Sequence, residues 1–374
     1  MKNIILLTVE LYPDAIGGRG QYARYLYELL NVKTITPKRR INLRLKNGAQ
    51  VRLPFSTMRH ALFLIAYPIY VIKAVAFILK EKPTIVISNT VYDALPPMLT
   101  GAKFIFILHD VFLFKKGIIS KALAKIALKK SIAIVSPSKA TISMLNYKIS
   151  QRITPKVSII ANPVDVDAFK KVDLISARSW LRSKTGSIIN ESTKVILYVG
   201  PISTLKGVHL LLDAYSRLEK ERNDLLLVLA GRFVDGVSNE SLRSSRIKYL
   251  GIITPPRIYY LFKAANIVVN PSMLEETQGR TVIEALAAEK YLIASATPAF
   301  IETAKDAGYY FKQGDVEDLY AKLRAILERV DAGFLENSKA MNVAKNYSLS
   351  KFKESWLALT GKCLATLNEF KPIL

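Results

Sequence analysis

Short apolar runs alternate along the chain with longer stretches in which apolar residues recur every three or four positions. The periodic stretches predict helices at 20–30, 208–221 and 254–265. Apolar strands separated by helices indicate parallel sheets that are covered on both faces. The apolar runs, rich in β-branched residues, predict strands at 3–9, 84–89, 103–108, 132–138, 156–161, 194–200, 224–231 and 265–272.

These strands are too many for one modest sheet, and a length of 374 residues also favours two domains. The chain is polar and charged between about 165 and 192, where no strong strand is predicted, so we place the join there. We therefore expect an α/β protein with two doubly wound domains, at 1–170 and 171–350, facing across a cleft at the carboxyl ends of their strands. A final helix, at 351–374, is expected to pack back on the N-terminal domain.

The stretch 61–79 is almost entirely apolar, and its 19 residues approach the thickness of a bilayer. Pro68 and Lys73 interrupt it and a buried strand follows closely, so we favour a helix packed on the first sheet. The alternative is a surface that dips into lipid. The apolar run at the N-terminus is too short for a signal peptide, and the single cysteine, Cys363, fits a reducing compartment, so we expect a cytoplasmic protein.

The formal net charge is +24, and the basic residues favour the first half of the chain. No Asp or Glu occurs between Glu28 and Glu81, where ten Lys or Arg residues lie. Lys121, Lys125 and Lys129 are four apart in a helical pattern and predict one cationic stripe. Such a surface attracts anionic lipid, nucleic acid or phosphorylated substrates, or is a plain solvated face. No nucleic-acid-binding motif accompanies the charge, so nucleic acid is the weakest of these partners.

Glu276, Thr277, Gln278 and Gly279 lie between the strand at 265–272 and a helix expected to begin near 281–284. The start of a helix presents backbone N–H groups and positive potential, which suit a phosphate or a polyhydroxyl ligand. A carboxylate there can accept hydrogen bonds from sugar hydroxyls. The plain alternative is that the acids only favour the helix dipole.

Three further features could bind a substrate. Lys206 follows a strand that ends in Gly200, where its charge could meet a diphosphate. Gly17 and Gly18 follow the first strand, where a glycine loop can admit phosphate oxygens. The spacing is not that of a dinucleotide-binding fingerprint, which disfavours a dehydrogenase. His109 follows the strand at 103–108 and could exchange a hydrogen bond with a substrate hydroxyl, or be structural.

Together these segments resemble retaining glycosyltransferases of the GT-B fold, in the large family 4 group (glycosyl transferases group 1). In "EETQGRTVIEALA" seven residues separate Glu276 from Glu284, which is similar to the family's acid-seven-acid motif. "LYVGPISTLKG", "YPDAIGGRGQYARYLYELL", "AIVSPSKAT" and "SIIANPVDVDAF" resemble other segments of that family in the same order. The resemblance covers nearly the whole length.

The resemblance implies that Glu276 faces the sugar of a nucleotide-sugar donor and that Glu284 holds the ribose hydroxyls. Lys206 would neutralise the diphosphate as it leaves, and His109 would hydrogen-bond the transferred sugar. It thus implies catalytic roles for Glu276, His109 and Lys206. The donor-binding residues would be Gly17, Gly18, Gly200, Lys206, Arg232, Thr277, Gln278, Gly279 and Glu284.

The sequence departs from the family at Pro201, where an arginine of the diphosphate clamp is usual. Arg280 and Arg232 are the candidates to replace it, and a catalytically degenerate binding subunit stays an open alternative. The resemblance implies no cofactor and no metal. Asp165 and Asp167 form a D-x-D pattern, but they lie at the entry to the predicted linker and are interpreted as structural.

We therefore expect a nucleotide-sugar-dependent glycosyltransferase of the hexosyltransferase type that retains the anomeric configuration. The basic N-terminal half favours an acceptor at a membrane surface, as a glycan or a lipid-linked saccharide. The protein would then be peripheral at the inner face of the cell membrane. The alternatives are the inactive binding subunit and, less favoured, a basic nucleic-acid-binding protein. The sugar, the nucleotide and the acceptor are not specified by the sequence.

Overall fold

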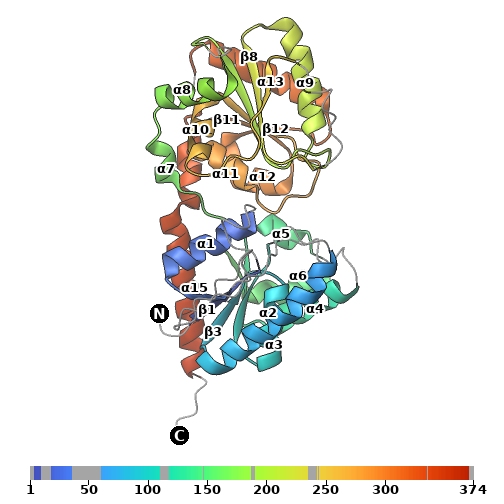
Figure 1. Cartoon of the computed structure of the whole chain (residues 1–374), viewed down its shortest axis with the longest axis vertical. Coiled ribbons are helices and arrows are strands. Elements are labelled where there is room, and N and C mark those ends of the chain that lie inside the picture. Colours follow the sequence, from blue (N-terminus) through green and yellow to red (C-terminus); the bar gives the residue numbers. More distant parts are fainter. Residues whose placement is uncertain are drawn as a thin grey trace. The chain divides into compact units, whose positions relative to one another are not determined.

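The structure is a computed structural model that describes residues 4–9, 18–35, 60–109, 118–145, 147–186, 190–234, 242, 244–334 and 336–369. The chain divides into two compact units (Figure 1). Unit 1 comprises Met1–Pro163 and Leu349–Leu374, and unit 2 comprises Val164–Ser348.

Unit 1 is built on a six-stranded parallel sheet with the strand order β2-β1-β3-β4-β5-β6. Its strands are β1 (Ile4–Leu7), β2 (Lys33–Ile35), β3 (Ile85–Ser88), β4 (Phe104–Ile107), β5 (Ala133–Ser136) and β6 (Val157–Ile159). Its helices are α1 (Gly18–Leu30), α2 (His60–Glu81), α3 (Leu95–Thr100), α4 (Ile118–Lys130), α5 (Lys139–Ser143), α6 (Tyr147–Ile153) and α15 (Leu349–Glu369).

The sheet of unit 1 is buried on both faces because successive residues of each strand point into different cores. In β1, Ile5 and Leu7 pack with α2 and α4, whereas Ile4 and Leu6 pack with α1 and α15. Figure 1 shows these two groups of helices on opposite sides of the strands. The continuous apolar runs of the sequence are therefore strands covered on both sides.

Unit 2 holds a second six-stranded parallel sheet, with the order β12-β11-β10-β7-β8-β9. Its strands are β7 (Lys194–Val199), β8 (Leu225–Ala230), β9 (Ile247–Tyr249), β10 (Ile267–Asn270), β11 (Tyr291–Ser295) and β12 (Gly308–Phe311). Its helices are α7 (Val166–Lys170), α8 (Leu174–Thr185), α9 (Val208–Glu221), α10 (Arg257–Ala264), α11 (Arg280–Ala287), α12 (Pro298–Ala304), α13 (Val316–Asp331) and α14 (Ala340–Ala344).

The two cores of unit 2 divide its helices between the faces of the sheet. One core contains residues of α8, α10 and α11 with Leu226 and Val228 of β8. The other contains residues of α9 and α13 with Leu225 and Leu227 of the same strand. Each unit is thus a doubly wound α/β domain, which confirms the fold class predicted from the sequence.

The division between the units falls after Pro163, before α7, whereas the sequence placed the join after residue 170. Asp165 is the N-cap of α7 and accepts a hydrogen bond from Ala168 N at 3.0 Å. A capping carboxylate of this kind satisfies one of the N–H groups at a helix start. The D-x-D pattern therefore contains a helix cap. At the other end of unit 2, Ser348 is its last residue, and α15 adds Phe352 and Trp356 to the core of unit 1.

Helix α2 includes the apolar stretch 61–79 and packs on the sheet through Tyr70, Ala74 and Ile78. Its other side keeps Ile72 and Leu79 exposed. Among the residues that the structure describes, no helix combines the length and the apolar content needed to cross a bilayer.

Candidate functional site

Two loops at the carboxyl ends of β7 and β10, which are neighbouring strands, contact each other directly. Met273 N donates a hydrogen bond to Leu205 O at 3.0 Å, which ties the loop after β10 to the loop after β7. Gly207 has a φ of 70°, and a β-carbon at this position would overlap the carbonyl of Pro271. Only glycine accepts both this conformation and this approach, so Gly207 allows the two loops to meet.

Lys206 and Glu276, one from each loop, form an ion pair with 2.6 Å between Nζ and Oε1. Ser272 Oγ donates to the same carboxylate oxygen at 2.7 Å. Tyr198 is close enough that the charge of Glu276, after burial, helps to raise the pKa of its phenol well above the ordinary range. The structure therefore brings together two predicted catalytic residues and adds Ser272, which the sequence analysis did not single out.

The loop after β10 ends at Gly279, the N-cap of α11. Gly279 has a φ of 85°, and a β-carbon there would overlap the ring of Phe300. Thr277 is partly buried, and Gln278 is buried and accepts a hydrogen bond at its carbonyl from Thr303 Oγ1 at 2.9 Å. Because glycine carries no capping side chain, the polypeptide backbone itself faces any ligand at this helix start.

Glu284 lies one turn inside α11 and is buried. Its carboxylate accepts a hydrogen bond from Arg280 Nε at 2.8 Å, a pairing four residues apart on the same helix. Arg280, one of the two candidates to replace the missing clamp arginine, is therefore bound to Glu284 through Nε. The carboxylate predicted to hold a ribose is held in place by this bond.

The backbone of Arg232 lies next to the segment that follows Pro201. Ile202 N donates to Arg232 O at 2.8 Å, and the side chain of Arg232 is exposed just after β8. Pro201 O accepts a hydrogen bond from Tyr198 OH at 2.6 Å, which fixes the start of the loop that follows Gly200. Of the two arginines, Arg232 is thus the one that neighbours the substituted position.

His109 lies in unit 1, just after β4, and is partly exposed. Its Nε2 is 2.8 Å from Asn89 Oδ1, and its ring meets the ring of Tyr22 edge to face at 4.9 Å. Burial, and next the positive charge of Arg19, lower the pKa of His109 to about 3. His109 is therefore neutral at physiological pH, and Asn89 holds it in place. The sequence analysis did not single out Asn89, and its position at the end of a strand was the only signal that could have indicated its role.

Of the predicted glycines of unit 1, Gly18 is the first residue of α1 and is exposed. A β-carbon at Gly18 would meet no atom within 4 Å, so the described structure does not require glycine there. Gly17 lies outside the described residues. Of the two glycines predicted to bind the donor in unit 1, the structure therefore describes only Gly18.

A comparison with known protein families finds a match in unit 2, in the segment that contains most of the predicted site residues. The sequence profile of the family Glycosyl transferases group 1 matches residues 182–343. This match covers less than half of the chain. The matched segment contains these predicted site residues: Gly200, Lys206, Arg232, Glu276, Thr277, Gln278, Gly279 and Glu284. Gly17, Gly18 and His109 lie outside it, and membership of family 4 stays a prediction.

Curated relatives with similar sequences include glycosyltransferases. The lipopolysaccharide 1,2-N-acetylglucosaminetransferase of Salmonella typhimurium is 26% identical over 54% of this chain and 53% of its own length. The alpha-monoglucosyldiacylglycerol synthase of Streptococcus pneumoniae is 27% identical over 44% of this chain and 37% of its own length. The chain thus spans about half the length, or less, of the curated relatives that it matches.

Solved structures resemble the whole described fold. The sucrose-phosphate synthase of Thermosynechococcus elongatus aligns with a TM-score of 0.79 at 18% identity, covering 97% of this chain and 99% of that one. Anabaena Alr3699/HepE, solved in complex with UDP-glucose, aligns with a TM-score of 0.75 at 17% identity, covering the same shares of both chains. These likenesses concern the fold, and they confirm the predicted GT-B class with its two Rossmann-like domains.

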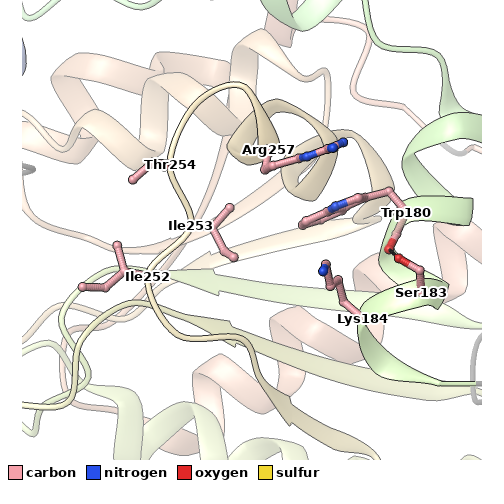
Figure 2. Close-up of a pocket in the computed structure, with 7 residues that line it drawn as sticks. All are labelled: Trp180, Ser183, Lys184, Ile252, Ile253, Thr254 and Arg257. Atoms are coloured by element: carbon pink, nitrogen blue, oxygen red, sulfur yellow. Dashed lines mark hydrogen bonds between the residues drawn. The ribbon is translucent and has the colours of Figure 1, made fainter. Parts of the chain in front are cut away.

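A cavity of about 420 Å³ lies in the same unit but is lined by none of the predicted residues (Figure 2). Trp180 of α8 and Ile253, in the loop before α10, form its apolar walls, and Lys184 and Arg257 contribute cationic groups. Arg257 also lies 5.6 Å from the centroid of the Tyr260 ring. The sequence analysis did not anticipate this cavity, because its walls come from α8 and from the segment 252–257, which lie far apart in the sequence.

Proposed function

We propose that the chain is a retaining glycosyltransferase that moves a hexosyl group from a nucleotide sugar to a hydroxyl of a glycan or lipid-linked acceptor. In this reaction the bond between the anomeric carbon and the diphosphate oxygen breaks. The acceptor oxygen bonds to the same carbon, and its hydroxyl proton passes to the leaving diphosphate. The observation that carries the proposal is the Lys206–Glu276 pair, because it places a cation suited to a diphosphate beside a carboxylate suited to sugar hydroxyls.

Each residue around this pair has chemistry that suits one part of a nucleotide sugar. Lys206 supplies a positive charge for the leaving diphosphate, which gains negative charge as the bond breaks. The backbone at Thr277, Gln278 and Gly279 offers its polar groups to sugar hydroxyls or to the distal phosphate. Glu284, oriented by Arg280, is suited to accept hydrogen bonds from two ribose hydroxyls.

The test is release of nucleoside diphosphate from a panel of nucleotide sugars, beginning with UDP-glucose, in the presence of candidate acceptors. Glu276→Gln is expected to abolish turnover, whereas the matched variant Glu275→Gln changes the exposed acid beside it and leaves turnover near the wild-type value. Loss of Lys206 is expected to lower kcat by about 100-fold to 1,000-fold. Equal activity of the two glutamate variants would refute the proposed role of Glu276.

Pro201 favours a second candidate, a catalytically degenerate subunit that binds a nucleotide sugar without transferring the sugar. Proline lacks the guanidinium that would grip a diphosphate with two hydrogen bonds. A thermal-shift screen distinguishes the two candidates, because bound ligand raises the melting temperature whether or not turnover follows. A donor that stabilises the protein and is never consumed, across a broad acceptor panel, would favour the degenerate subunit.

We further propose that unit 1 docks peripherally on an anionic membrane at the inner face of the cell membrane, where a lipid-linked acceptor would lie. Lys121, Lys125 and Lys129 are all exposed on α4. Large apolar side chains are exposed on the same side of the sheet, where α2, α3 and α4 pack. They are Ile72 (67% exposed), Leu79 (58%) and Leu99 (62%). Exposed aliphatic groups beside lysines are typical of surfaces that enter a lipid headgroup layer.

Each basic residue near an anionic surface contributes about 1 kcal/mol to binding. Replacing the three α4 lysines by glutamine is therefore expected to lower the vesicle partition coefficient by about 100-fold. The measurement is flotation with vesicles of phosphatidylglycerol and phosphatidylcholine at low and high salt. A matched triple variant of exposed unit 2 lysines, Lys220, Lys305 and Lys312 to glutamine, should bind as the wild type does. Equal loss in both triple variants would show net charge alone to be responsible and would remove the docking surface.

A further inference from the structure

Three neighbouring strands of unit 1 end in a row of hydrogen-bonded polar side chains. Thr8 follows β1, Asn89 follows β3 and His109 follows β4, and the strand order β1-β3-β4 sets them side by side. Thr8 and Asn89 have no exposed surface. A fully buried amide is costly unless its polar atoms are bonded, so its partners determine which way it faces.

The partners of Asn89 fix the orientation of its amide. Asn89 Nδ2 donates to Thr8 Oγ1 at 3.0 Å and to the backbone carbonyl of Arg19 at 3.4 Å. A carbonyl only accepts hydrogen bonds, so the amide nitrogen must face Arg19 and the amide oxygen must face His109. Asn89 Oδ1 is then the acceptor of the 2.8 Å bond, and His109 Nε2 must carry the proton.

A neutral imidazole carries one N–H, so a proton on Nε2 leaves Nδ1 as an acceptor. The groups around the His109 ring do not favour a second proton on it. The nearby guanidinium is Arg19, which disfavours an imidazolium, and burial acts in the same direction. Tyr22, whose ring contacts His109, has a phenol pKa raised far above its ordinary value by burial, so it supplies no negative charge.

We propose that Asn89 is a positioning residue that holds His109 as the Nε2-protonated tautomer, so that Nδ1 accepts a hydrogen bond from a hydroxyl of the sugar substrate. This inference rests on the proposed function for the identity of the substrate. It also sets a specificity, because an acceptor nitrogen pairs with a hydroxyl but not with a carboxylate. A neutral hexose is therefore favoured over a hexuronic acid at this position.

The tautomer is tested by nitrogen-15 NMR of the histidine rings, which needs no enzymatic activity. The chain has only three histidines, and His109→Gln assigns the signal of interest. The wild type is expected to show one His109 tautomer, protonated at Nε2, that does not titrate between pH 5 and 8. In Asn89→Asp, the carboxylate next to Nε2 is expected to raise the pKa of His109, so that the ring takes up a proton within this range. A wild-type ring protonated at Nδ1, or an Asn89→Asp ring that still does not titrate, would overturn the proposal.

The specificity is tested by comparing UDP-glucose with UDP-glucuronate. A site that pairs a hydroxyl with a fixed acceptor rejects a mismatched group by roughly 10⁴-fold in kcat/KM. Asn89→Asp turns Nδ1 into a donor, so the preference for glucose is expected to fall by about tenfold or more. Asn89→Leu, which removes the acceptor without adding charge, frees the tautomer, so it should raise KM and lower the preference for a neutral sugar less than Asn89→Asp does. An unchanged preference in Asn89→Asp would refute the specificity.

These two measurements separate the failure of this inference from the failure of the proposed function. If neither UDP-sugar is turned over, the proposed function fails for these donors, and the NMR result still decides whether Asn89 sets the tautomer. If UDP-glucose is turned over and the NMR shows the other tautomer, the function stands and the inference is wrong. Preserved dispersion of the amide NMR spectrum confirms that each Asn89 variant is folded.

Discussion

The Lys206–Glu276 pair allows the proposed donor site to be tested before any substrate is known. Lys206 keeps 26% of its side-chain surface exposed, and Glu276 keeps 18%. Exposed ion pairs contribute about 0–1 kcal/mol, whereas breaking a buried one costs about 3–5 kcal/mol. A half-buried pair with a further hydrogen bond from Ser272 should lie between these limits, so we expect a coupling free energy of about 1–2 kcal/mol.

A double-mutant cycle of Lys206→Met and Glu276→Gln measures this coupling through the free energy of unfolding in urea. The chain has two tryptophans, so a Trp356→Phe background leaves Trp180, in unit 2, as the reporter for the unit that carries the pair. A coupling below about 0.3 kcal/mol, the level at which independent sites are additive, would refute the energetic role of the pair.

The same two variants have opposite expected effects on ligand affinity. A diphosphate competes with Glu276 for Lys206, so Glu276→Gln should bind UDP at least as tightly as the wild type although it no longer catalyses transfer. Lys206→Met should bind UDP about tenfold or more weakly, because one charge-assisted contact is lost. Isothermal titration calorimetry with UDP distinguishes these outcomes. Weaker binding of UDP to both variants would mean that Glu276 supports the phosphate site rather than competing for its lysine.

Three further outcomes follow from single positions. Gly279→Ala should destabilise the protein by about 2–4 kcal/mol in urea unfolding, since it adds overlap with Phe300 to the cost of a positive φ, whereas Gly333→Ala, with a φ of 89° and open space, should cost only about 1 kcal/mol. Lys290 is buried, and desolvation lowers its pKa to about 8, so the unfolded chain binds more protons than the folded one between pH 8 and 10.5. The unfolding free energy should therefore rise by up to about 3 kcal/mol across that window, and Lys290→Met should flatten the profile. Arg232→Gln should raise KM for the nucleotide sugar by about tenfold and leave the melting temperature of the ligand-free protein unchanged, because its exposed side chain makes no ion pair with any described residue.

The sequence predicted those parts of the fold that depend on local pattern. Continuous apolar runs such as 224–231 and 265–272 became buried parallel strands because both faces of each sheet are covered. The strands at Lys33–Ile35, Ile247–Tyr249, Tyr291–Ser295 and Gly308–Phe311 were not predicted. The edge strands among them are short or mixed in polarity, and their pairing depends on neighbours far away in the sequence.

The candidate site divides in the same way. The positions of Lys206, Glu276 and Gly279 at strand-to-helix loops followed from the pattern, because such loops collect at one edge of a parallel sheet. The pairing of Lys206 with Glu276 across 70 residues did not, since it depends on Gly207 packing against Pro271. Asn89 was also missed, because its role arises only when three strand ends lie side by side.

The substitution at Pro201 changes how the proposed site would hold a diphosphate. Proline removes both a guanidinium and a backbone N–H, and Tyr198 holds its carbonyl in place. Among the described residues of unit 2, Lys206, Arg232 and Arg280 are the candidate cations for a diphosphate, and two of them are bound to acids. A diphosphate must therefore draw Lys206 away from Glu276, be bound by Arg232, or depend on the backbone at the start of α11. Salt screens hydrogen bonds from backbone N–H groups less than it screens exposed side-chain charges. If the N–H groups at the start of α11 hold the diphosphate, binding of the nucleotide sugar would be only weakly sensitive to ionic strength. A steep salt dependence would instead assign the missing arginine's role to Arg232.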